Sequence, residues 1–111
     1  MDATIYYLEP IHDGRKSFYK KAYVVEERGY KTLYSYDTPV VQITWRGDLV
    51  RLWPGYSATT MRHVNEFLKQ NGYGRDYGGK AWWNRQPARK YEDGFSYSAR
   101  YRCFYHSPRA L

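Results

Sequence analysis

Cysteine is almost absent from this chain of 111 residues, which contains only Cys103. A single cysteine cannot form a disulfide within the chain, so packing must hold the fold together. No stretch approaches the roughly 20 consecutive apolar residues that a membrane-spanning helix needs. The first residues, MDATIYYLEP, also lack the basic start and apolar run of a signal peptide. These absences predict a cytoplasmic protein with one domain over residues 1–111 and no membrane partner.

Clustered metal ligands and nucleotide-binding motifs are missing as well. The acidic residues are scattered, and Cys103 with His106 supplies at most half of a zinc site, which needs about four ligands. There is no P-loop, no G-x-S-x-G elbow and no Rossmann fingerprint. We therefore expect no metal, no cofactor and no catalytic residues. One enzymatic alternative stays open, a metal-free ribonuclease built from the tail residues Arg100, Tyr101, Arg102, Tyr105 and His106.

The chain has a strong excess of positive charge, with 18 Lys and Arg against 11 Asp and Glu and a net charge of +7. Residues 1–73 hold ten basic against eight acidic side chains, whereas residues 74–111 hold eight against three. Most of the excess thus lies in the last third. A field of this kind attracts phosphate groups or acidic proteins, which favours a nucleic acid or a protein–nucleic-acid complex as the partner.

Strand-forming residues dominate the first half of the chain. Tyr, Val and Thr favour strands, and short glycine-containing turns separate the runs, as at Arg28-Gly29-Tyr30 and Arg46-Gly47-Asp48. The pattern predicts strands over residues 18–27, 31–37, 39–45 and 49–53. The amino-terminal TIYYLEP is a candidate for a further edge strand.

One helix is predicted over SATTMRHVNEFLKQNG. Ser57 is placed to cap its first amides, and Asn71-Gly72 supplies the left-handed residue that ends a helix. At helical spacing one arc contains mainly apolar side chains, namely Met61, Val64, Phe67 and Leu68. Arg62, Glu66 and Lys69 fall on the opposite, solvent-facing arc.

After Gly72 the chain changes character. Residues 73–94 begin with a glycine-rich loop and continue through AWWNRQPARK, whose conformation the sequence leaves open, although Pro87 argues against a long helix. The following FSYSARYRC alternates cleanly and predicts a strand within residues 95–105. The expected architecture is α+β, with residues 15–72 supplying four strands and the helix. In all, about five mostly antiparallel strands pack one face against that helix.

The candidate binding surface combines tryptophan with positive charge. Basic grooves with aromatic platforms hold flat or single-stranded nucleic acids. In an extended segment, Trp82 and Trp83 point to opposite sides, so one belongs to the core and the other to the surface; alternatively, both cover a small core. The surface is expected to contain Lys80, Trp82, Trp83, Arg85, Arg89, Lys90, Arg100 and Arg102, with Lys20 and Lys21 as weaker candidates.

Four stretches carry a resemblance to known proteins: SFYKKA (17–22), TLYSYDTPV (32–40), GYSATTMRHVNEFLKQNG (55–72) and GGKAWWNRQ (78–86). They resemble a family of small uncharacterised proteins from phages, plasmids and other mobile elements of Gram-positive bacteria. The resemblance covers roughly residues 15–86 and leaves out the final FSYSARYRCFYHSPRAL. It implies a context rather than an activity, because small mobile-element proteins regulate DNA, adjust replication or block host defence, as anti-CRISPR proteins do.

Together these patterns predict a non-enzymatic protein that binds a nucleic acid or a nucleoprotein complex through a basic, aromatic surface. Inhibition of a host defence nuclease, in the anti-CRISPR manner, is one form of this hypothesis. Regulatory binding to DNA or RNA is the second, and the metal-free ribonuclease is the third. The oligomeric state is left open by the sequence.

Overall fold

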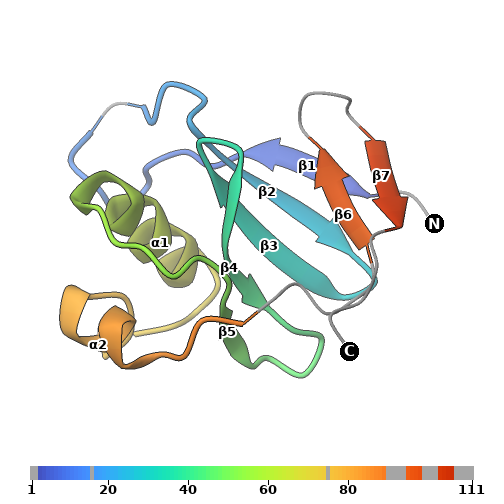
Figure 1. The fold of residues 1–111 in the computed structure, drawn as a ribbon. Coiled ribbons are helices and arrows are strands. Elements are labelled where there is room, and N and C mark those ends of the chain that lie inside the picture. The colour runs from blue at the N-terminus through green and yellow to red at the C-terminus, as the bar shows by residue number, and fades with distance from the viewer. Residues whose placement is uncertain (1–2, 16, 75, 90–94, 99–102, 107–111) are drawn as a thin grey trace.

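The strand-forming first half of the chain folds into one antiparallel sheet. The computed structural model describes residues 3–15, 17–74, 76–89, 95–98 and 103–106. Each strand pairs with its neighbours in the sequence, so the order across the sheet is β1-β2-β3-β4-β5 (Figure 1). The strands are β1 (Thr4–Tyr7), β2 (Ala22–Glu27), β3 (Tyr30–Ser35), β4 (Thr38–Ile43) and β5 (Leu49–Arg51).

Tight turns connect the central strands. Arg28 and Gly29, between β2 and β3, both have left-handed φ angles of 55° and 81°. Tyr36 and Asp37, between β3 and β4, likewise have φ angles of 51° and 63°. Two successive left-handed residues make the turn whose twist matches that of the paired strands. The hairpins therefore follow from local backbone geometry.

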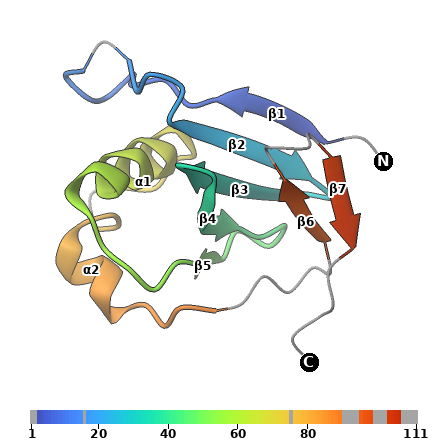
Figure 2. The same cartoon turned by 45° about the horizontal axis from the view of Figure 1, so that its top comes forward.

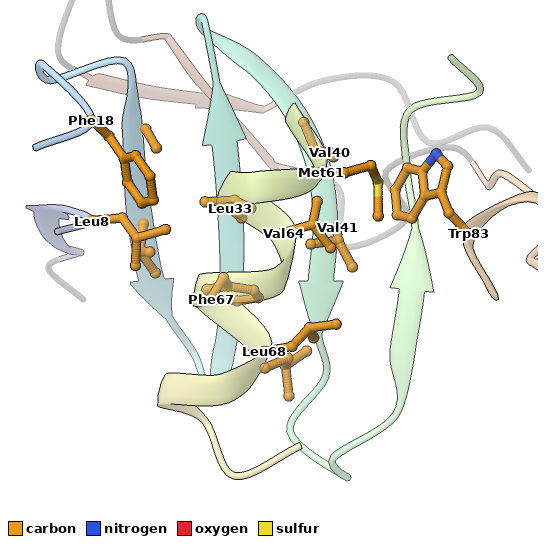
Figure 3. Close-up of a cluster of buried hydrophobic side chains, with 13 residues drawn as sticks. Leu8, Phe18, Leu33, Val40, Val41, Met61, Val64, Phe67, Leu68 and Trp83 are labelled. Carbon is orange, nitrogen blue, oxygen red and sulfur yellow. The ribbon is translucent and has the colours of Figure 1, made fainter. Parts of the chain in front are cut away.

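The long helix α1 (Ala58–Gln70) covers one face of the sheet (Figures 1 and 2). Its bounds follow the predicted signals, because the Ser57 side chain accepts a hydrogen bond from the Thr60 amide at 3.0 Å and Gly72 has a φ of 86°. The apolar stripe of α1 packs against apolar residues of β2, β3 and β4, as Figure 3 shows. The predicted α+β architecture is confirmed. Neither helix in the described part of the chain is long and apolar enough to span a membrane.

The carboxyl-terminal strand prediction was wrong in its details. Residues 95–105 were expected to hold one strand, but two short strands, β6 (Phe95–Ser98) and β7 (Cys103–His106), pair with each other. The alternation of residues correctly indicated extended backbone at Phe95–Ser98, but alternation does not specify which strand it pairs with. The fifth strand of the main sheet is the amino-terminal β1.

Glu66 was expected to face solvent, but its side chain is only 1% exposed. The connection between β1 and β2 crosses α1 at this point. His12 donates its backbone N–H to one carboxylate oxygen at 2.6 Å, and its Nδ1 lies 2.8 Å from the other. Burial alone would raise the pKa of Glu66, but hydrogen bonds from Gln70, His12 and Ile11 hold it below its ordinary value.

His63 is buried beneath the same connection, with 2% of its surface exposed. Its Nδ1 lies 2.8 Å from the Ser35 hydroxyl, and its ring meets the edge of Phe18 at 4.7 Å between centroids. Burial is the main cause that lowers the pKa of His63 from 6.5 to about 4, with a smaller contribution from the charge of Arg15 and a small opposing one from Asp13. The ring is therefore neutral at physiological pH.

This burial predicts that the fold loses stability in mild acid. Between the unfolded pKa of 6.5 and the folded value of about 4, only the unfolded chain takes up the proton on His63. The free energy of unfolding should therefore fall by about 2 kcal/mol between pH 7 and pH 5. His63→Gln, which cannot titrate, should flatten this slope in urea unfolding followed by circular dichroism. An equal slope in the variant would assign the acid sensitivity to another group.

Candidate nucleic-acid interface

The segment with the two tryptophans is helical, whereas the orientation expected for their side chains assumed an extended backbone. Helix α2 (Lys80–Arg85) begins after Gly79, whose carbonyl accepts the Trp83 amide at 2.7 Å, and ends before Pro87. The helix is short enough for Pro87 to lie outside it, so the proline does not oppose it. Successive residues of a helix are about 100° apart, so Trp82 and Trp83 do not point to opposite sides of α2, and their ring centroids lie 6.1 Å apart.

Trp83 is a core residue and is not available to a ligand. Its side chain is 0% exposed, and its indole Nε1 donates to the Gly55 carbonyl at 2.7 Å. Figure 3 shows it at the β5 side of the core, at the opposite end from Leu8 and Phe18. The indole therefore anchors α2 to the rest of the molecule.

The buried guanidinium of Arg51, at the end of β5, fastens α2 and the loop before α1 together. It donates five hydrogen bonds to backbone carbonyls, at 2.7 to 3.2 Å. Its Cζ also lies 4.5 Å from the centre of the Trp83 ring. The accepting carbonyls belong to Trp53, Pro54, Gly55, Trp83 and Gln86. Because they come from both segments, the single arginine fixes the position of α2 relative to the sheet.

A row of aromatic rings connects α2 with the loop that precedes it. Trp82 is half-buried and meets Tyr77 edge-on at 5.9 Å, and Tyr77 meets Tyr73 edge-on at 5.4 Å. The Tyr73 hydroxyl donates to the carbonyl of Gly47 in the β4–β5 turn. Tyr77 lies at the surface and is exposed. The row therefore places an accessible tyrosine beside α2.

Three of the predicted basic residues lie on α2 or just after it, and all three are exposed: Lys80, Arg85 and Arg89. The Lys80 ammonium lies 5.0 Å from the centre of the exposed Tyr56 ring. The Arg89 amide donates to the Arg51 carbonyl at 2.7 Å, which holds the end of this segment against β5. Within the described ranges, no carboxylate lies within 4.0 Å of these three cations. Their charge is thus open to solvent.

The remaining predicted site residues are not part of this surface. Lys20 and Lys21 lie just before β2, three strands away from β5 in the sheet order, and Lys20 instead covers Tyr7 at 5.6 Å. Lys90, Arg100 and Arg102 fall outside the described residues. Among the residues that the structure describes, no three His, Cys, Asp or Glu side chains gather to hold a metal ion.

Sequence reasoning missed Arg51, Tyr56 and Tyr77. A signal for Arg51 was present. Leu49, Arg51 and Trp53 are two residues apart along the predicted strand, so the arginine points toward the same face as two large apolar side chains. Nothing local marks Tyr56 or Tyr77 among fourteen tyrosines. Their role depends on the loops that bring them beside α2.

Comparison with known proteins gives a family but no activity. Residues 6–85 match DUF8033, described as a family of unknown function. The match begins within β1, contains β2 to β5 and both helices, and ends before β6 and β7. It carries no link to phages or to anti-CRISPR proteins. No curated protein and no solved structure matches the chain.

The position of α2 should depend on the shape of the Arg51 side chain as well as on its charge. Arg51→Lys keeps the cation but cannot reach five carbonyls, so it should lower the free energy of unfolding by about 2–4 kcal/mol. Arg46→Lys is the matched control, because Arg46 is exposed over Trp45 at 4.8 Å. That change should stay within about 0.5 kcal/mol. Urea unfolding measures both, and equal effects would contradict the role assigned to Arg51.

Proposed function

The chain belongs to DUF8033, a family of unknown function, and we propose that it binds nucleic acid through the outer surface of α2. We name this the α2 surface: Lys80, Arg85 and Arg89 with the flanking Tyr56, Tyr77 and Trp82. The observation that carries the proposal is the grouping of three exposed cations, none of them neutralised by a described carboxylate, beside two exposed tyrosines.

Phosphate binding accounts for the cations. Lys80 and Arg85 extend from one short helix, and Arg89 follows four residues later on a segment held against β5. Cations on a rigid element lose little freedom when they bind a phosphate backbone. The charge balance of the neighbourhood supports this, because Asp76 is the only acidic residue among residues 74–89. We take the target to be a nucleic acid rather than an isolated anion because the cations are spread over ten residues.

The aromatic residues favour unpaired bases over duplex. A stacked base adds about 1–3 kcal/mol to the binding of a single strand, and every base can stack. Tyr56, below the Lys80 ammonium, and Tyr77, beside Trp82, are both exposed, whereas bases in a duplex would be hidden from them. The α2 surface is therefore suited to single-stranded DNA or RNA without sequence preference.

The role we propose is binding without catalysis. The described histidines lie elsewhere in the molecule: His63 is buried and neutral, and His12 contacts the Glu66 carboxylate of α1. Neither is among the residues of the α2 surface. The ribonuclease alternative depends on tail side chains that lie outside the described residues, so it has no support from this geometry.

Two biological settings fit a binder of this kind. In the narrower one, the nucleic acid is held by a host defence nuclease, and the protein of a mobile element occupies that complex in the anti-CRISPR manner. This form rests on the resemblance of residues 15–86 to mobile-element proteins. In the broader one, the protein regulates free DNA or RNA. A pull-down from a bacterial host, analysed for protein and nucleic acid after nuclease treatment, separates the two.

Binding should depend on salt and on the α2 cations. Each phosphate contact to a single strand contributes a slope of about 0.7 in the logarithm of affinity against salt. With three contacts, affinity for a fluorescent single strand should fall about 20-fold between 50 and 200 mM salt. The double variant Lys80→Ala and Arg85→Ala should bind more weakly and reduce the slope by roughly 1.4. Fluorescence anisotropy measures both quantities.

The matched control removes the same charge elsewhere. Lys20→Ala with Lys21→Ala changes two exposed lysines before β2 and should lose much less affinity than the α2 variant. Equal losses would mean that only the net charge matters and would refute the assignment to α2. Absence of binding by the parent protein to any DNA or RNA at 50 mM salt would refute the proposed function itself.

Absence of catalysis is tested separately. RNA incubated with an excess of the protein in EDTA should remain intact on a denaturing gel, because binding residues alone supply no nucleophile activation. Cleavage that disappears in His106→Ala would instead support the ribonuclease. The tail side chains, not α2, would then be the site.

A further inference from the structure

Strand β1 is an edge strand with unusually exposed apolar side chains. All four of its residues are exposed, and the three large ones, Ile5, Tyr6 and Tyr7, show 40%, 37% and 44% of their surface. Within the described residues, β1 pairs with β2 on one side only. Proteins usually protect such edges with charge, proline or a covering segment. β1 carries neither a charged residue nor a proline.

Among the described residues, the backbone of β1 has hydrogen-bonding groups without a strand partner at regular positions. The Leu8 amide donates to the Ala22 carbonyl at 2.9 Å, which sets the phase of the ladder with β2. In an antiparallel pair, alternate residues bond to the neighbouring strand, so Tyr6 and Thr4 also direct their amide and carbonyl toward β2. Ile5 and Tyr7 therefore direct theirs away from the sheet.

We propose that the open edge of β1 binds β1 of a second copy of this chain, as an antiparallel pair around a two-fold axis at Tyr6. Ile5 then lies opposite the partner's Tyr7, and Tyr7 lies opposite the partner's Ile5. Each of these two pairs exchanges both of its backbone hydrogen bonds, so four new bonds form. The two sheets join into one continuous sheet of ten strands.

A second copy fits this edge better than an unrelated strand, because the edge is self-complementary. The strand itself is uncharged, so two proteins of net charge +7 meet where neither presents a cation on the paired residues. The ends differ in charge. Glu26 lies beside Thr4 and accepts a hydrogen bond from Tyr6, whereas Lys20 lies over Tyr7. Antiparallel pairing places the basic end of each strand opposite the acidic end of its partner, which parallel pairing would not do.

The side chains support the same arrangement. Ile5 lies opposite Val25 and Tyr7 opposite Tyr23, so both continue the sheet face that contains the stacked Tyr23 and Tyr34 rings. The nearby Glu9 does not oppose pairing, since it has left the strand and its carbonyl accepts a hydrogen bond from Gln70 on α1. A contact confined to two short strands is smaller than a standard interface, so the dissociation constant should be roughly micromolar to millimolar.

The first test is the oligomeric state as a function of concentration. Sedimentation velocity should show a reversible shift from monomer to dimer as the concentration of protein rises from micromolar to millimolar. Ile5→Pro removes an amide that faces away from β2, so it should abolish the dimer and leave the melting temperature nearly unchanged. Ile5→Val is the matched control, because it keeps the amide and a β-branched side chain, and it should still dimerise.

The second test reads the register. In a Cys103→Ser background, Tyr6→Cys should form a disulfide-linked dimer on mild oxidation, because the two-fold axis places the two residues at position 6 about 4.5 Å apart between Cα atoms. Thr4→Cys lies on the same strand and the same face, but its partner copy would be about 14 Å away. It should cross-link far less.

These experiments can overturn the proposal in several ways. A monomer at all concentrations would do so, as would a dimer that persists in Ile5→Pro, since the copies would then meet elsewhere. Equal cross-linking at positions 4 and 6 would reject the two-fold register. Capture of a different protein's strand at β1, by a chain that stays monomeric, would also reject self-pairing. The outcome does not depend on whether the α2 surface binds nucleic acid.

Discussion

The buried guanidinium of Arg51 is the interaction on which the candidate surface depends. A cation inside a protein is unfavourable unless its charge is matched, and here five carbonyl dipoles and the face of Trp83 replace a carboxylate. The five carbonyls belong to the segment after β5 and to α2. Without Arg51, five backbone carbonyls in these two segments would each lose a hydrogen bond, and α2 would be held mainly by the Trp83 indole and by the Arg89 amide.

This arrangement separates the two tryptophans and gives each a different task. Trp83 supplies the apolar contact and an indole hydrogen bond to Gly55, so the helix cannot rotate without exposing it. Trp82 packs at the boundary between the core and the exposed Tyr77. Lys80 and Arg85 are then exposed on a helix whose position is fixed by the Trp83 side chain. An anchored helix of this kind combines a stable position with an accessible charge, which a glycine-rich loop alone would not provide.

Two edges of the molecule contrast in how they are protected. At the β5 edge, a bridge between Arg51 and Ala88 and the α2 segment cover the strand. At the β1 edge, the described residues provide no such cover, and the exposed side chains are apolar. Because the β5 edge is covered and the β1 edge is open, strand pairing with a second copy would occur at β1. Pairing at β1 would leave the α2 surfaces of both copies accessible, because α2 lies beyond the opposite edge of the sheet (Figures 1 and 2).

Much of the fold follows from short stretches of the chain. Capping, periodicity and left-handed φ angles are properties of a few consecutive residues. Ser57 and Gly72 therefore mark the ends of α1, and Arg28-Gly29 marks the turn between β2 and β3. The buried face of α1 follows from the spacing of its apolar residues, Met61, Val64, Phe67 and Leu68. The α+β class and the basic residues Lys80, Arg85 and Arg89 could be identified in the same way.

Other features were decided by contacts between distant segments. Glu66 occupies a polar position of its helix, yet it is buried because His12, 54 residues away, closes over it. Arg51 and Trp83 become partners across 32 residues, and that contact determines which tryptophan is hidden and which side of α2 faces solvent. Local patterns therefore specify where helices and strands form. The burial of side chains, the exposure of charges and the protection of strand edges depend on which distant segments pack together, because the folded chain determines which groups water can reach.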